Sequence, residues 1–222
     1  SSLINMAKYP SWQDEYWLML MQLYLKRPQG MKPLYSRGLV DLALELHFPP
    51  EYLYRKMFKL RQIDTPNLQR LWDTYADNPR RLTREVKLLK RMNGFGNASE
   101  FYAGVAVNES WEKDFKPLEG VEPEGLTPVM LIMILDLYFR LTPNTMVVET
   151  PEVVSLAKSI RTKPEEVVGI MQAYQVCDPY LNNQHPVAPT LLDACQQVWK
   201  RFGNEDPEKI AALAAQLKDY WK

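Results

Sequence analysis

A row of cationic side chains is the strongest chemical signal in the sequence. Its members recur at steps of four, three and four residues, which on a helix places them on one face: Arg80, Arg84, Lys87 and Arg91. Such a row neutralises the phosphates of a nucleic acid and makes binding strongly dependent on salt. A solvated helix face without a ligand carries the same pattern, so both interpretations stay open here.

A second group of cations lies about 20 residues earlier in the chain. It comprises Arg55, Lys56, Lys59 and Arg61, with Tyr52 and Tyr54 among them. These residues follow a tight break at Pro49-Pro50, on the helix that would read a nucleic acid. The complete candidate nucleic-acid-binding set is Arg55, Lys56, Lys59, Arg61, Arg80, Arg81, Arg84, Lys87 and Arg91.

The signatures of enzymes are missing from the sequence. Neither of the two histidines, His47 and His185, belongs to a motif with metal-ligand spacing. Cys177 and Cys195 set no disulfide framework; we expect two buried thiols in a reducing compartment, with a Cys177–Cys195 pair as the alternative. We therefore predict no catalytic centre, no cofactor and no metal.

Charge is divided unevenly along the 222 residues although the net charge is zero. The chain up to Trp111 has 16 Lys and Arg against 11 Asp and Glu, a net charge of +5. The remainder has 11 basic and 16 acidic residues, a net charge of −5. The basic half favours a polyanionic partner such as DNA, and the acidic half favours another protein or a second copy of the chain.

Short helices must position these residues. Seventeen prolines against nine glycines indicate many sharp breaks, and apolar residues recur at helical spacing between the breaks. We predict an all-α protein with helices over residues 11–27, 39–46, 50–60, 68–75, 79–93, 128–140, 151–160, 164–174, 191–202 and 207–221.

No segment of the sequence suits a membrane. The longest apolar run, Val129–Leu135, is far shorter than the roughly 20 residues that span a bilayer. No basic segment followed by an apolar one opens the chain, so no signal peptide is recognised. We therefore expect a cytoplasmic protein.

The segment 103–125 differs in character from its surroundings. It holds six acidic residues, two prolines and three glycines, and it has no sustained hydrophobic period. We interpret it as an acidic linker, with Trp111 and Phe115 pinning part of it to a neighbouring surface. The predicted domains are then residues 1–102, basic, and 126–222, acidic.

The two predicted domains are related by a constant shift of 114 positions. Aligning Trp17–Asp64 with Leu131–Asp178 without gaps gives ten identities in 48 positions. The identities include Pro50/Pro164, Glu51/Glu165 and Ala43/Ala157. Chance agreement between amphipathic helices is the alternative, but the shared Pro-Glu and Leu-Ala pairs lie outside simple apolar patterning. We interpret the pattern as a tandem duplication of one helical domain.

Each copy has a long helix followed by two shorter helices around a tight turn, the order of a helix-turn-helix domain. The second copy carries five short motifs: Leu137-Tyr138-Phe139, Pro151-Glu152, Leu156-Ala157, Arg161-Thr162 and Asp178-Pro179. The first copy keeps Leu23-Tyr24-Leu25, Leu42-Ala43 and Asp64. It has no Pro-Glu pair where the second copy has Pro151-Glu152, and no Arg-Thr pair at the turn. The pattern resembles tandem helix-turn-helix, winged-helix-like domains of uncharacterised bacterial proteins, similar to the unit preceding some nuclease and regulatory domains. The resemblance implies a fold; no nuclease motif accompanies it.

The sequence predicts a non-catalytic, regulatory nucleic-acid-binding protein that acts through its basic N-terminal domain. The second copy does not share this property, because its matching helix begins with Glu165 and Glu166 and has no Lys or Arg. Two leading carboxylates would be repelled by phosphate. The alternative is a protein-interaction or scaffold module that has the fold and does not bind DNA.

Overall fold

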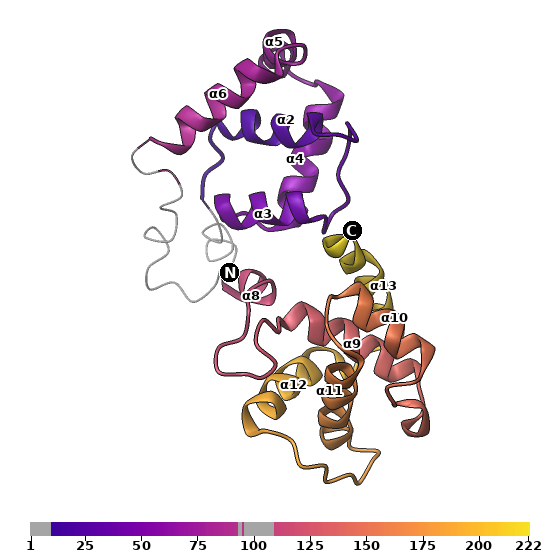
Figure 1. Ribbon diagram of the computed structural model, residues 1–222. Helices are drawn as coiled ribbons and strands as arrows, with labels where there is room; N and C mark the ends of the chain where they lie inside the picture. The colour runs from indigo at the N-terminus through magenta and orange to yellow at the C-terminus, as the bar shows by residue number, and fades with distance from the viewer. Residues whose placement is uncertain (1–9, 93–94, 96–108) are drawn as a thin grey trace. The chain divides into compact units, whose positions relative to one another are not determined.

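The computed structural model describes residues 10–92, 95 and 109–222. All regular secondary structure within these residues is helical, with no strand among them, which confirms the predicted all-α class. The chain divides into two compact units between Glu112 and Lys113, with Lys222 grouped with the first. Figure 1 shows the helices of each unit.

The N-terminal unit is built from five helices in the described residues: α2 (Tyr16–Leu25), α3 (Arg37–Leu46), α4 (Pro50–Gln62), α5 (Pro66–Tyr75) and α6 (Pro79–Lys90). Its core lies where α2, α3 and α4 meet, and the buried residues include Leu20, Leu39 and Leu53. Helix α6 packs against α2 and α5, and Figure 1 shows α6 running beside α2. Helix α5 is tied to α4 by the Trp72 Nε1–H group, which donates to the Leu60 carbonyl at 2.9 Å.

The C-terminal unit contains α9 (Pro128–Arg140), η1 (Pro143–Thr145), α10 (Pro151–Ser159), α11 (Pro164–Cys177), α12 (Pro189–Phe202), α13 (Pro207–Leu217) and η2 (Lys218–Trp221). Helix α9 is its centre, because Val129 to Tyr138 are all buried and α10, α11, α12 and α13 pack around it. A helix that is apolar on every side belongs in a core. The buried Tyr174 hydroxyl on α11 donates to the Leu131 carbonyl on α9 at 2.6 Å.

Proline marks the start of most of these helices. Helices α4, α5, α6 and α9–α13 each begin at a proline, which lacks the N–H that the first turn cannot satisfy. The Thr127 hydroxyl accepts from the Met130 N–H at 3.3 Å, and the Asp206 carboxylate accepts from the Glu208 N–H at 3.0 Å. The predicted starts at Thr127-Pro128 and Asp206-Pro207 are therefore confirmed.

Equivalent positions in the two units adopt the same local structure. With a shift of 114 residues, α2, α3 and α4 overlap α9, α10 and α11. A residue with a left-handed backbone follows each of α3 and α10. After α3 it is His47, at φ 63°, and after α10 it is Arg161, at φ 59°. The next N–H then reaches back to the carbonyl of Ala43 at 3.2 Å and of Ala157 at 2.9 Å.

Some predicted boundaries differ from the structure. The first helix begins at Tyr16 instead of Ser11, because the N–H groups of residues 16–18 bond to carbonyls three residues back and form a turn there. The helix predicted over residues 79–93 ends at Lys90, and Arg91 and Met92 are no longer helical.

Part of the predicted linker is folded. Helix α8 (Glu109–Asp114) spans the division between the units, and Trp111 packs against the core of the N-terminal unit. Phe115 and Val121 are buried in the C-terminal unit, and residues 103–108 lie outside the described part. The predicted domain bounds stay a prediction. In the described residues, no helix combines the length and apolar character that crossing a membrane requires.

Candidate nucleic-acid interface

Helix α4 carries the first group of predicted cations. Its inner face is fixed by Leu53, Met57 and Leu60, which are fully buried. Glu51 lies in the first turn, and Lys59 and Arg61 lie in the last, where each charge suits the helix dipole. The sequence thus forms a stable helix and turns a polar face outward.

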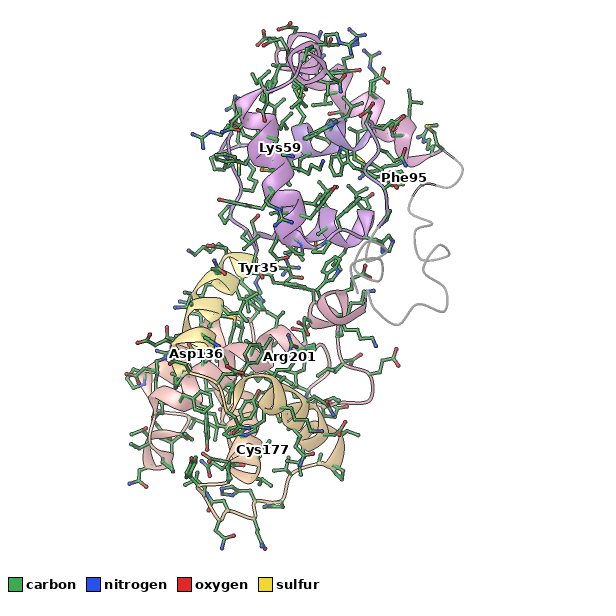
Figure 2. All side chains as sticks on the ribbon, turned by 180° about the vertical axis from the view of Figure 1, so that it is seen from behind. Tyr35, Lys59, Phe95, Asp136, Cys177 and Arg201 are labelled. Carbon is green, nitrogen blue, oxygen red and sulfur yellow. The ribbon has the colours of Figure 1, made fainter. Side chains whose placement is uncertain are left out.

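The outer face of α4 is exposed along its whole length. It consists of Glu51, Tyr54, Arg55, Phe58, Lys59, Arg61 and Gln62. Helix α4 packs against α2 and α3 on its inner side, and its outer face stays in solvent in the described structure. Figure 2 labels Lys59 on this helix. Two aromatic rings share the face with the cations, Tyr54 at 37% and Phe58 at 45% exposure.

Lys56 differs from the other cations of α4 because it is half-buried among aromatic rings. Its Nζ lies 4.9 Å from the centre of the Trp12 ring and 5.4 Å from those of Trp17 and Tyr52. Burial lowers the pKa of the Lys56 ammonium, and the nearby charge of Lys59 adds to this effect. The structure therefore places Lys56 against the aromatic core, apart from the outer face that carries Arg55, Lys59 and Arg61.

Helix α6 carries the second group of cations on its solvent side. Leu82 and Val86 are buried against the core, and the predicted row is exposed opposite them: Arg80, Arg84, Lys87 and Arg91. Arg81 is exposed as well, with its guanidinium 5.5 Å from the centre of the Tyr75 ring. The nine predicted residues thus fall into one group on α4, one on α6, and Lys56.

The cations of both groups lack anionic partners. No described carboxylate forms an ion pair with any of Arg55, Lys59, Arg61, Arg80, Arg84, Lys87 and Arg91. Lys90, outside the predicted set, pairs with Glu45 at 3.2 Å. In the C-terminal unit, Arg140 pairs with Asp136 at 3.0 Å and Arg201 with Asp114 at 2.8 Å. The positive charge of α4 and α6 is therefore available to an external anion.

Sequence reasoning missed Phe58. Its signal was present in the spacing, because Phe58 follows Tyr54 by four residues and falls between Arg55 and Lys59 on the same helix. An aromatic residue at helical spacing is usually a core residue, which is why the pattern alone does not assign it to the surface.

Helix α11, which begins 114 positions after α4, offers no such face. It packs against α9, α10 and α12, and Glu165 is its one exposed residue. The residues 114 positions after Arg55, Lys59 and Arg61 are Gly169, Ala173 and Gln175, all uncharged. Ala173 and Gln175 are buried.

The thiols and the second histidine of the C-terminal unit have structural surroundings. Burial, with a smaller contribution from Asp178, raises the pKa of the Cys177 thiol to about 11. Burial raises the pKa of Cys195 further, and Cys177 adds to it. His185 Nε2 lies 2.7 Å from the Gln175 side-chain oxygen, which holds a loop against α11. Thiols with raised pKa values are poor nucleophiles at neutral pH.

Each unit also has a hollow. In the N-terminal unit a groove of about 560 Å³ lies between α2, α3 and α6, and the Glu45–Lys90 ion pair lies at its edge. In the C-terminal unit a pocket of about 320 Å³ is lined by Asp114 and Arg201, which pair with each other. No group of three metal-ligating side chains occurs in the part of the chain that the structure describes.

No protein-family model matches this chain, and neither a curated protein nor a solved structure matches it. The arrangement of the side chains is therefore the basis on which a function is assigned.

Proposed function

We propose that this protein is a non-catalytic, regulatory nucleic-acid-binding protein whose N-terminal unit binds phosphates through the cations of α4 and α6. The observation that carries the proposal is that these cations are exposed and have no anionic partner in the part of the chain that the structure describes: Arg55, Lys59, Arg61, Arg80, Arg84, Lys87 and Arg91. A polyanion gains most from charges that no internal carboxylate neutralises, since each phosphate contact releases a counterion.

The local fold supports a helix-turn-helix origin. Helices α3 and α4 are joined by three residues, His47 to Pro49, and pack on α2, which is the arrangement of such a domain. The matching φ values of His47 and Arg161, and the matching bonds to Ala43 and Ala157, support a duplication of this domain. In this interpretation, the second copy keeps the core and has lost the cations of its second helix.

A protein-interaction role is the second candidate function. The exposed rings of Tyr54 and Phe58 favour it, because exposed apolar side chains that gather on one face commonly contact a protein partner. The two candidates are separated by their response to charge reversal and to salt.

The test is a titration of fluorescently labelled mixed-sequence DNA, single-stranded and duplex, at about 50 and 200 mM salt. One variant reverses the charges of α4 with Arg55→Glu, Lys59→Glu and Arg61→Glu. A second reverses those of α6 with Arg80→Glu, Arg84→Glu, Lys87→Glu and Arg91→Glu. The matched control carries three reversals at exposed positions of the C-terminal unit: Lys158→Glu, Lys200→Glu and Lys218→Glu.

We expect the wild-type protein to bind with an affinity that falls steeply as salt rises. Both N-terminal variants should lose binding, and the control, which has the same change in charge as the α4 variant, should keep it. Absence of wild-type binding to either form of DNA at low salt would refute the proposal and favour a protein partner. An equal loss in the control would show that net charge, and not the faces of α4 and α6, governs binding.

A further inference from the structure

The outer face of α4 has two parallel rows of different chemistry. Tyr54, Phe58 and Arg61 follow one another at steps of four and three and form one row. Arg55 and Lys59 each directly follow a ring in the sequence and form a second row beside it. Rings and cations therefore alternate across one exposed surface, which we call the ring–cation face: Tyr54, Arg55, Phe58, Lys59 and Arg61.

The two rings of this face have no aromatic partner among the described residues of the unit. Neighbouring aromatic residues pack closely with one another; the rings of Phe48 and Tyr52, for example, stack with centroids 4.8 Å apart. Tyr54 and Phe58 contact no other ring in the described residues, although α4 also holds Tyr52 and Lys56 in an aromatic cluster on its other side. Core packing therefore does not explain why these two rings are aromatic.

The spacing of the rings suits unpaired bases. Four residues of helix separate Tyr54 from Phe58, a rise of about 6 Å. Bases in a duplex follow at about 3.4 Å and expose their edges, not their faces, to a protein. Two rings whose positions differ by a rise of about 6 Å along the helix can each stack on a base only where the strand is unpaired and its bases are drawn apart.

We propose that the ring–cation face binds single-stranded nucleic acid, with Tyr54 and Phe58 each stacked on a base. Arg55, Lys59 and Arg61 contact the phosphates on either side. This inference rests on the proposed function and names its ligand class. The charges agree with it, since the three cations of the face have no anionic partner among the described residues, and the carboxylate on the outer face of α4, Glu51, accepts from the Tyr35 hydroxyl at 2.7 Å.

Helix α11 of the C-terminal unit has no second site of this kind. The residues 114 positions after Tyr54 and Phe58 are Val168 and Gln172, and neither is exposed. Helix α11 therefore presents no ring–cation face of its own.

The experiment measures the affinity of the full chain for a labelled mixed-sequence single strand and for the same sequence as a hairpin duplex, in one buffer. The variants are Phe58→Ala, Phe58→Leu and Phe58→Tyr, with Val154→Ala as the control, because Val154 is an exposed apolar residue of the C-terminal unit. Leu keeps apolar bulk without a ring, and Tyr keeps the ring. Circular dichroism and thermal melting establish that each variant is folded.

We expect the wild-type protein to favour the single strand. Phe58→Ala and Phe58→Leu should weaken that binding by about 5- to 150-fold, the usual range for the loss of one stacked base, while Phe58→Tyr and Val154→Ala leave it unchanged. Duplex binding should be the same in all variants.

Three results would overturn the inference in distinguishable ways. Equal affinity of the wild type for both DNA forms, with no effect of Phe58→Ala, would leave nucleic-acid binding standing and remove stacking. Binding of neither form would refute the proposed function itself. Binding of neither form, together with a concentration-dependent dimer that Phe58→Ala dissociates in analytical ultracentrifugation, would assign the face to a second copy of the chain.

Discussion

Helices α4 and α11 begin 114 positions apart in the chain and differ in how much of their outer side is exposed. Both begin with Pro-Glu, and both bury the same inner row: Leu53, Met57 and Leu60 in α4, and Val167, Met171 and Tyr174 in α11. The outer side of α4 is exposed, whereas α12 packs on α11. The comparison teaches that one core pattern supports either a surface or an interior helix, depending on where the next helix packs.

The cause lies in the connection that follows each helix. After α4, residues 63–78 include α5, and α6 then packs against α2 and α5. After α11, residues 178–188 form no helix, and α12 packs on α11 and α9. Because α12 covers α11, charged side chains on its outer side would be costly, since a buried charge without a partner is strongly destabilising.

Exchanging residues between the two helices should have the largest effect on stability. Ala173→Lys introduces at a fully buried position of α11 the residue that α4 has as Lys59. We expect a loss of about 3 kcal/mol or more in the free energy of unfolding, because the ammonium would be buried without a partner. The reverse change, Lys59→Ala, should alter stability by about 0.5 kcal/mol or less, because position 59 is exposed.

Urea unfolding followed by far-UV circular dichroism compares the two variants. Equal stability changes would break the comparison, since they would mean that the outer sides of α4 and α11 have the same surroundings. A much larger loss in Ala173→Lys would sharpen it and show that α12 covers α11 in solution.

Alkaline pH should destabilise the C-terminal unit through its thiols. Cys177 takes the position that Ile63 has after α4, and burial raises its pKa to about 11. An unfolded thiol ionises near pH 8.5, whereas burial raises the pKa of both Cys177 and Cys195 in the folded unit. The stability that these buried, neutral thiols contribute is therefore fully present below about pH 8.5. That contribution is lost as the pH rises toward the folded pKa, so the urea midpoint should fall between about pH 8.5 and 11.

The double variant Cys177→Ala, Cys195→Ala provides the control for this prediction. It should show a smaller fall in the urea midpoint than the wild type over the same pH range. At about pH 8, a thiol reagent should react much more slowly with the folded protein than with the protein in urea. Equally fast reaction in both states would mean that the two thiols are accessible in the fold, contrary to the buried position of Cys195.

Local signals explain what the sequence predicts well. Proline after Thr or Asp set helix starts such as Pro128 and Pro207, and apolar spacing identified the inner face of α4. These features depend on a few neighbouring residues. The covering of α11 by α12 depends on the path of a connection and on packing between distant segments, which spacing does not encode.

The candidate site also combines features that local spacing predicts with features that depend on distant residues. The exposed cations of α6 follow directly from helical spacing, because Leu82 and Val86 fix which side faces the core. The surroundings of Lys56 do not, because the ring nearest to its ammonium belongs to Trp12, 44 residues earlier in the chain. The sequence pattern does not distinguish Lys56 from Lys59, whereas in the fold Lys56 is packed against aromatic rings and Lys59 is exposed.

The smallest predicted effect distinguishes these two lysines. Lys59→Gln should reduce the slope of log affinity against log salt by about 0.7 for a single strand, the loss of one phosphate contact, and leave stability unchanged. Lys56→Gln should leave the slope unchanged, because the Lys56 ammonium lies over the rings of Trp12, Trp17 and Tyr52. It should instead lower the free energy of unfolding, by about 0.5–2 kcal/mol, through the lost cation–π contacts. Salt titration and urea unfolding of both variants give the two readouts, and an equal loss of slope in both would place the Lys56 ammonium beside that of Lys59 on the ring–cation face.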